Sequence, residues 1–101
     1  MISRLWRGMA KVTHADSYVE HLREETFPKL GNIPGFVDAS ILRRRVDQGI
    51  EFLIVTRWNS MEAIEQFAGR ESDVAVVPEK VQEMMIYYDR TVRHYEMLDL
   101  V

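Results

Sequence analysis

Apolar residues recur along the chain with two different periods, and each period predicts one kind of element. Four segments alternate apolar and polar residues or are apolar almost throughout, which is typical of strands: residues 2–11, 36–46, 50–58 and 86–98. Three others repeat apolar residues every three or four positions, which is typical of helices with one buried side: residues 13–30, 60–68 and 78–85. Gly, Pro and Asn separate these elements, as at Gly31-Asn32 and Pro34-Gly35.

The order of these elements predicts the fold. Strand, helix, a hairpin of two strands, helix and strand is the split βαβ order of ferredoxin-like domains. We therefore expect an α+β protein of βαββαβ order with a four-stranded antiparallel sheet. The 101 residues suit a single domain, which we assign to residues 1–101.

Both faces of the predicted sheet carry large apolar residues, which predicts a partner surface. Helices cover only one face in this fold, and the other face of a monomer is usually polar. Here both sides of the first, third and last strands carry Leu, Ile, Val, Trp, Tyr or Met. We therefore expect a homodimer through the sheet face, in which two sheets form an α/β barrel. The alternative is that residues 95–101 fold back over their own sheet.

Composition excludes several classes of function. The chain has no Cys, which excludes a disulfide framework, a thiolate metal site and a cysteine nucleophile. A net charge of -3 argues against nucleic acid as a partner. The N-terminal strand is too charged for a signal peptide or a membrane span, so we expect no membrane contact and a cytoplasmic location. The basic run at residues 43–45 is expected to be a solvated strand end.

Three segments carry a resemblance to a known family. They are Ile33-Pro34-Gly35-Phe36, the run from Phe52 to Ala63 that contains Trp58-Asn59-Ser60-Met61-Glu62-Ala63, and Phe67-Ala68. They resemble the antibiotic biosynthesis monooxygenase family of dimeric α/β barrels. In that family a Pro-Gly-Phe turn opens the second strand, and a Trp-x-Ser-x-Glu-Ala segment joins the third strand to a helix. The resemblance covers nearly the whole chain and implies the same fold and dimer.

What the resemblance implies about activity is broader. Members of the family include cofactor-free oxygenases of aromatic polyketides and quinols, haem-degrading enzymes and proteins without known activity. The haem-degrading branch has an Asn, a Trp and a His where this chain has Trp6, Phe67 and a position near Pro78. All three depart, so no axial ligand is expected there and haem degradation ranks low. We expect no cofactor.

His94 is the candidate general base. His14 and His21 are expected to be solvated, and no histidine spacing fits a metal site, so no metal is predicted. His94 lies in the last strand, which pairs with the first strand in this topology, where Arg4 and Trp6 lie. Such a neighbourhood keeps imidazole neutral near pH 7, able to take a proton from a phenol or enol. Arg4 or Arg57 would stabilise the oxyanion. The alternative is a structural His94 at the dimer surface.

The remaining candidates would form an apolar site for a small aromatic ligand. We expect Trp6, Phe67, Trp58, Tyr88 and Met84 to bind substrate, although Trp58 and Met84 also suit a purely structural core. The first hypothesis is a cofactor-independent, monooxygenase-like enzyme acting on an aromatic, polyketide or quinol-type molecule. The alternative is a dimeric ligand-binding or stress-associated protein without turnover. A deep pocket with polar groups beside His94 would favour the enzyme.

Overall fold

The elements of the computed structural model, which describes residues 1–100, follow the predicted order. The strands are β1 (Ile2–Ala10), β2 (Phe36–Arg45), β3 (Ile50–Trp58), β4 (Met85–Tyr88) and β5 (Arg93–Glu96), and the helices are α1 (Ala15–His21), α2 (Phe27–Gly31), α3 (Met61–Ala68) and α4 (Glu79–Met84). The predicted α+β, ferredoxin-like fold is confirmed. Ser60 caps α3, because its Oγ accepts a hydrogen bond from the Ala63 amide at 3.2 Å.

The strands form one antiparallel sheet in the order β2-β3-β1-β4, and β5 also pairs with β1. The register places Arg4 of β1 opposite Thr56 of β3 on one side and opposite His94 of β5 on the other. Directly opposed residues of antiparallel strands point to the same face. Arg4, Thr56 and His94 therefore share one face of the sheet.

The last strand differs from the prediction of one continuous strand over residues 86–98. It is divided into β4 and β5, and both parts pair with β1. Between them the backbone leaves β1 and bonds instead to the connection between α3 and α4. The Ala75 amide donates to the Arg90 carbonyl at 2.9 Å, and the Val92 amide donates to the Asp73 carbonyl at 2.8 Å. These bonds compete with the expected ladder and interrupt the strand.

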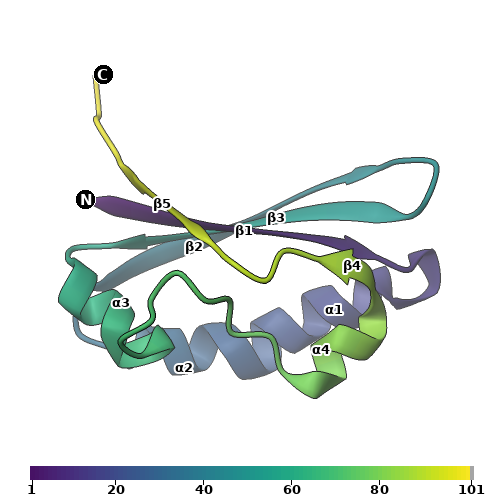
Figure 1. The fold of residues 1–101 in the computed structure, drawn as a ribbon, viewed down its shortest axis with the longest axis horizontal. Coiled ribbons are helices and arrows are strands. Elements are labelled where there is room, and N and C mark those ends of the chain that lie inside the picture. Colours follow the sequence, from purple (N-terminus) through teal and green to yellow (C-terminus); the bar gives the residue numbers. More distant parts are fainter. Residues whose placement is uncertain (101) are drawn as a thin grey trace.

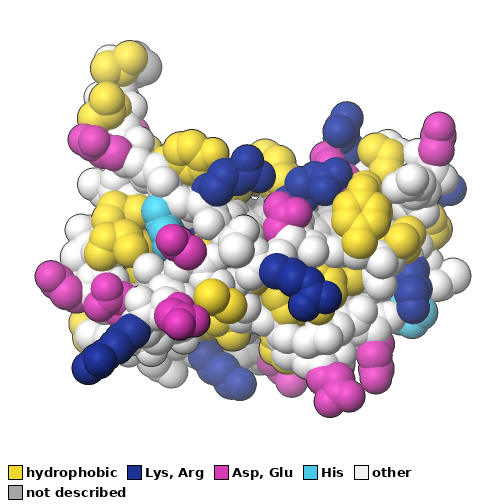
Figure 2. All heavy atoms as spheres, in the orientation of Figure 1, with side chains coloured by type: hydrophobic (Ala, Val, Ile, Leu, Met, Phe, Trp, Pro, Cys, Tyr) yellow, Lys and Arg dark blue, Asp and Glu magenta, His cyan; other side chains and the backbone are white. Residues whose placement is uncertain are grey.

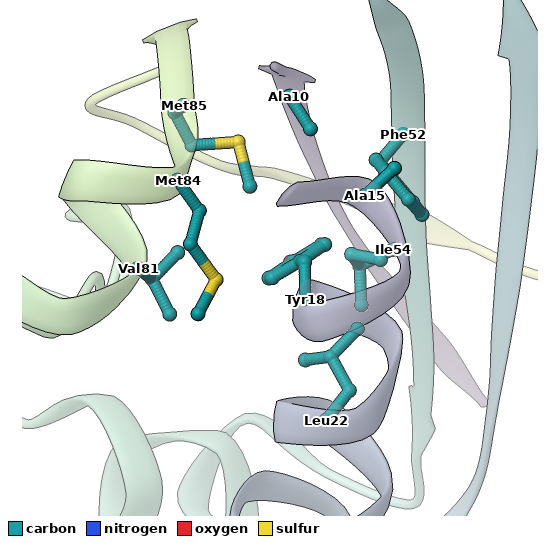
Figure 3. Close-up of a cluster of buried hydrophobic side chains, with 9 residues drawn as sticks. All are labelled: Ala10, Ala15, Tyr18, Leu22, Phe52, Ile54, Val81, Met84 and Met85. Atoms are coloured by element: carbon teal, nitrogen blue, oxygen red, sulfur yellow. The ribbon is translucent and has the colours of Figure 1, made fainter. Parts of the chain in front are cut away.

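All helices lie on one face of the sheet (Figure 1), and the core fills the space between them. In Figure 3, Val81 and Met84 of α4 point toward Tyr18 and Leu22 of the first helical segment. Phe52 of β3 closes this cluster and is fully buried. A second cluster under α3 consists of Leu30, Trp58, Ala63 and Ile64.

The first helical segment is less regular than predicted. A π-helical turn over Leu22–Thr26 separates α1 from α2 and ends two residues before Pro28. Proline has no amide N–H to continue the regular helical pattern, and a widened turn accommodates its ring. The expectation that His21 is solvated is wrong: only 8% of the residue is exposed, and its Nδ1 lies 3.0 Å from Oε2 of Glu25.

The helix-free face keeps several apolar side chains accessible. Leu42, Tyr87 and Tyr95 are at least two-fifths exposed. The C-terminal segment extends away from the body of the molecule (Figures 1 and 2), with Leu98 and Leu100 largely exposed, rather than folding over its own sheet.

Candidate functional site

A cavity of about 80 Å³ lies between the helix-covered face of the sheet and the helices. Its lining is almost entirely apolar and comes from every layer of the fold: Arg4, Trp6, Tyr18, Leu22, Thr26, Phe27, Leu30, Ile54, Thr56, Phe67, Val76, Val77, Pro78, Val81 and Val92. Arg4 is the one side chain in this set that carries a charge at neutral pH. Ligand sites of proteins commonly combine apolar walls with a few such polar groups.

Arg4 is buried, with 5% of its surface exposed, and its guanidinium meets only neutral acceptors. Nη1 donates to the Ser72 carbonyl at 2.5 Å and contacts Nε2 of His94 at 3.0 Å. Nη2 donates to the Val74 carbonyl at 3.2 Å, and the guanidinium carbon lies 5.7 Å from the centre of the Phe67 ring. No carboxylate bonds to this guanidinium directly among the described residues.

The contact with Arg4 fixes the protonation state of His94. A guanidinium can only donate, so Nε2 of His94 must be the unprotonated acceptor and Nδ1 carries the hydrogen. Nδ1 lies 3.3 Å from Oδ1 of Asp73, which suits that tautomer. Burial lowers the pKa of His94 below its usual value, the positive charge of Arg4 lowers it further, and Asp73 opposes both effects. Both the geometry and the lowered pKa favour a neutral imidazole at His94 near pH 7.

Burial also acts on Arg4, lowering its pKa to about 10 while the charge of Asp73 partly opposes the shift. The group remains a cation at neutral pH. A desolvated cation attracts a developing negative charge more strongly than a hydrated one, because little water screens the interaction. Chemically, the cavity offers apolar walls with one positive charge among them.

Gly8 gives Trp6 its place in the wall of the cavity. A Cβ atom on Gly8 would collide with the indole of Trp6, so the ring can lie along β1 only because position 8 has no side chain. The indole Nε1 donates to the Asp89 carbonyl at 2.8 Å. The Trp6 ring is tilted against Tyr18, with centroids 6.1 Å apart. Gly8 was not among the predicted site residues, although a glycine within a strand indicates close approach by another group.

The other predicted site residues divide between the cavity, the core and the far face. Phe67 lines the cavity and stacks on Trp58 with centroids 6.1 Å apart, whereas Trp58 is fully buried in the second cluster. Met84 packs in the core and Tyr88 packs against it, both outside the cavity lining. Arg57 lies on the helix-free face, where it pairs with Asp38 and donates to Ser40 Oγ at 3.0 Å.

Sequence reasoning missed the connection between α3 and α4. This segment supplies Asp73 beside His94, the two carbonyls on Arg4, and three cavity-lining residues. Main-chain carbonyls have no signature in the sequence, and Asp73 lies in a stretch without periodic pattern. No sequence signal identified either contribution.

Other kinds of site find no support in the part of the chain that the structure describes. Residues 1–100 contain no group of three or more His, Asp or Glu side chains placed to hold a metal ion. None of their helices is long and apolar enough to cross a membrane. The basic run at residues 43–45 is exposed, and Arg44 pairs with Glu51 at 2.7 Å.

Comparison with known proteins identifies relatives by fold. A candidate antibiotic biosynthesis monooxygenase from Bacillus cereus is 22% identical, with 100% of this chain and 96% of that chain covered and a TM-score of 0.67. A similar candidate from Caulobacter crescentus is 13% identical, with 97% and 90% covered and a TM-score of 0.70. The haem-degrader MhuD of Mycobacterium tuberculosis, with two haems in its active site, is 17% identical over 100% of both chains, with a TM-score of 0.67. No curated protein matches the chain.

The residues of this chain do not fit a haem group. Among residues 1–100, the cavity lining contains no His and no Met, and the chain has no Cys. The one phenol in the lining, Tyr18, is kept protonated because burial raises its pKa. The usual axial ligands to haem iron are thus missing from the lining.

The family is shown by sequence. The sequence profile of the antibiotic biosynthesis monooxygenases matches residues 1–77, about three-quarters of the chain. That range includes Arg4, Trp6, Gly8 and the whole connection up to Val77. This chain belongs to the antibiotic biosynthesis monooxygenase family.

Proposed function

We propose that this protein is a cofactor-independent, monooxygenase-type enzyme that oxidises a compact aromatic molecule carrying an ionisable hydroxyl group. One observation carries the proposal: a buried guanidinium without a directly bonded carboxylate stands at the end of an apolar cavity. Such a cation stabilises a phenolate or enolate formed beside it. Membership of the family supports the reaction class.

In this proposal Arg4 binds the substrate oxygen, and His94 takes its proton. The Ser72 carbonyl and Nε2 of His94 both contact the same nitrogen of Arg4. A substrate oxygen in the place of that carbonyl therefore lies next to the imidazole. When the Arg4 side chain shifts toward the substrate and the contact between Nη1 and Nε2 breaks, the lone pair of Nε2 is free to accept the proton. Asp73 then stabilises the imidazolium through Nδ1.

The oxidation step balances with molecular oxygen alone. The electron-rich ring carbon of the anion forms a bond to oxygen and gives a peroxide. The proton held by His94 goes to the outer oxygen of this peroxide. Loss of the proton on that carbon and cleavage of the O–O bond then leave a carbonyl, and the outer oxygen departs with both protons as water. The substrate supplies all the electrons. Trp6 and Phe67 would hold the ring, and the apolar walls would keep water from the anion.

The test is oxygen consumption by the purified protein with a panel of naphthols, anthrones and quinols. We expect uptake of oxygen with at least one compound, one labelled atom from ¹⁸O₂ in the product, and loss of uptake in Arg4→Met and His94→Ala. If no compound causes uptake and His94→Ala behaves as the wild type, the enzyme proposal is wrong.

The alternative, a binding protein without turnover, has one observation in its favour. Both ring nitrogens of His94 already have partners in this structure: Nε2 contacts Arg4, and Nδ1 contacts Asp73. A histidine so engaged can serve a structural role alone. Tight binding of the same compounds without oxygen consumption would favour this reading.

We further propose that the protein works as a homodimer through its helix-free face. Leu42, Tyr87 and Tyr95 form the exposed apolar part of this face, and a two-fold axis would cover both copies at once. Sedimentation equilibrium should give twice the mass of one chain, and Leu42→Asp combined with Tyr95→Asp should give a single chain. A wild-type protein that sediments as a monomer at micromolar concentration would contradict the dimer.

A further inference from the structure

The connection between α3 and α4, residues 69–78, closes the candidate cavity from one side. We call this segment the strap. Val76, Val77 and Pro78 of the strap line the cavity, and Figure 1 shows the segment passing beside the sheet between the two helices. A ligand in the cavity must therefore either fit beside the strap or displace it.

The strap is held in place by polar contacts rather than by burial. None of residues 69–78 is buried, and Val74 and Val76 are nearly half exposed. Arg4 binds its Ser72 and Val74 carbonyls, and Arg90 and Val92 supply two main-chain hydrogen bonds. Segments with few buried apolar contacts open at a low free-energy cost.

One end of the strap is a glycine in a backbone conformation that other residues rarely adopt. Gly69 has φ of 83° and ψ of -171°, and a Cβ atom there would meet no neighbour within 4 Å. The residue thus has both conformational freedom and room to rotate. At the other end, Pro78 precedes α4 and fixes where the strap must rejoin the fold.

The cavity, which is partly open to solvent, is small for the proposed class of substrate. Its volume is about 80 Å³. An engineered protein cavity that binds a single benzene ring has about 150 Å³. In addition, the strap carbonyls already occupy the Arg4 nitrogens that would bind a substrate oxygen. A substrate oxygen can take these positions on Arg4 only if the strap moves, and movement would also enlarge the small cavity.

We propose that the strap is a lid that the ligand displaces, in which the Ser72 and Val74 carbonyls hold the place on Arg4 that a phenolate or enolate oxygen takes in the complex. The inference rests on the proposed binding of an ionisable aromatic molecule. The bonds from Arg4 to the two carbonyls are already strengthened by the charge of the guanidinium. An anionic acceptor adds direct charge–charge attraction in a site that little water screens. An anion therefore displaces the carbonyls, and a neutral ring of the same shape does so poorly.

A disulfide across the strap tests this directly, because the chain has no cysteine of its own. Val74 forms an isolated antiparallel bridge with Thr91, and the hydrogen bonds on either side of it make this a non-hydrogen-bonded pair. Cα atoms in such pairs are about 4.5 Å apart, which a disulfide spans. Oxidised V74C/T91C holds the strap closed, and the same protein after reduction is its own control.

The probes are 2-naphthol and 2-methoxynaphthalene, which share their rings and differ in the acidic hydroxyl. We expect wild type and reduced V74C/T91C to bind 2-naphthol at least tenfold more tightly than the ether, and oxidised V74C/T91C to bind 2-naphthol at least tenfold more weakly. In wild type, 2-naphthol should also speed hydrogen exchange at the Ala75 amide, which bonds to Arg90 in the closed state. This second readout needs no engineered residue.

Equal binding to the oxidised and reduced forms would overturn the lid, as would unchanged exchange at Ala75 on saturation. Equal binding of the two probes, or no binding of either, would overturn the assigned ligand class. These outcomes are separate from the failure of the proposed reaction. Binding that depends on the open strap without oxygen consumption would leave the lid in place and remove only the enzyme.

Discussion

The two faces of the sheet differ in how their charged side chains are paired. On the helix-free face, Glu51 receives two arginines, with Arg7 Nη2 at 2.8 Å and Arg44 Nε at 2.7 Å, and these hydrogen bonds lower the pKa of the Glu51 carboxyl. On the helix-covered face, Arg4 is more deeply buried, and its bonded partners are two carbonyls and a neutral imidazole. In the first cluster both carboxylate oxygens of Glu51 are paired with guanidinium groups, whereas in the second the buried guanidinium has no bonded anion.

This difference indicates which face binds a ligand. The carboxylate of the Glu51 cluster already pairs with two guanidinium groups and needs no further cation, so this cluster suits a structural role. A buried cation whose acceptors are all neutral has poor compensation for its lost hydration. An anion entering the cavity would supply that compensation. Four pairs of substitutions test this contrast.

The largest expected effect is a difference in unfolding free energy between substitutions on the covered face and on the helix-free face. Phe52→Ala on the helix-covered face removes a fully buried ring and should cost about 3–5 kcal/mol of unfolding free energy. Leu42→Ala on the helix-free face removes a side chain from a residue that is 48% exposed, and the isolated chain should lose no more than about 0.5 kcal/mol. Urea unfolding at low protein concentration measures both, and equal losses would contradict the contrast.

Next in size is the effect of removing each arginine on the reaction. Arg4→Met should lower kcat/KM for an accepted phenol by about 10²–10³-fold, as loss of an oxyanion-stabilising donor does in other enzymes. Arg7→Met, at the matched place on the other face of β1, should leave kcat/KM within about twofold, since it touches only the Glu51 cluster and Tyr87. A comparable loss in Arg7→Met would show that the charge near the cavity does not matter.

A smaller effect is expected from Gly8→Ala, which fills the space under Trp6. The added methyl group must displace the indole or the backbone of β1, at a cost of about 1–3 kcal/mol in unfolding free energy. Gly31→Ala is the matched control, because a Cβ there meets no neighbour within 4 Å. Near-ultraviolet circular dichroism should report the displaced Trp6 in Gly8→Ala alone. Unchanged stability and spectrum would show that Trp6 does not depend on the glycine.

The smallest effects separate the two clusters by pH. The pKa of His94 is lowered in the folded protein, so below about pH 6.5 the unfolded chain binds the proton more readily and stability falls as the pH drops. The pKa of Glu51 is lowered from 4.5, so its stabilisation is present above that value and is lost in more acidic solution. His94→Gln should therefore flatten the melting temperature between pH 7.5 and 5.5, and Glu51→Gln should flatten it only below pH 4.5. A profile that His94→Gln leaves unchanged would contradict the assignment.

Most of the fold followed from the sequence because it rests on periodic patterns. The apolar runs predicted the strands, and the three- and four-residue spacing that includes Tyr18 and Leu22 predicted the buried side of the first helical segment. The exceptions are places where a few tertiary contacts override local pattern. The last strand divides where residues 90–92 bond to the strap.

The site was predictable only in part, for a similar reason. Strand order brought Arg4, Trp6 and His94 to one end of the sheet, and the structure places Arg4 and His94 in contact. The parity of β3 already separated Arg57 from Thr56 and therefore from Arg4. The role of the strap could not be predicted from the sequence. Its contribution to the site consists of main-chain carbonyls and of one aspartate that lies outside any periodic pattern.

The most direct test of the account is the side-chain Nε–H spectrum of ¹⁵N-arginine-labelled protein during titration with 2-naphthol. The account predicts that the Arg4 resonance shifts progressively and that those of Arg7 and Arg57, on the other face, stay in place. A shift at Arg7 or Arg57 with Arg4 unmoved would contradict it.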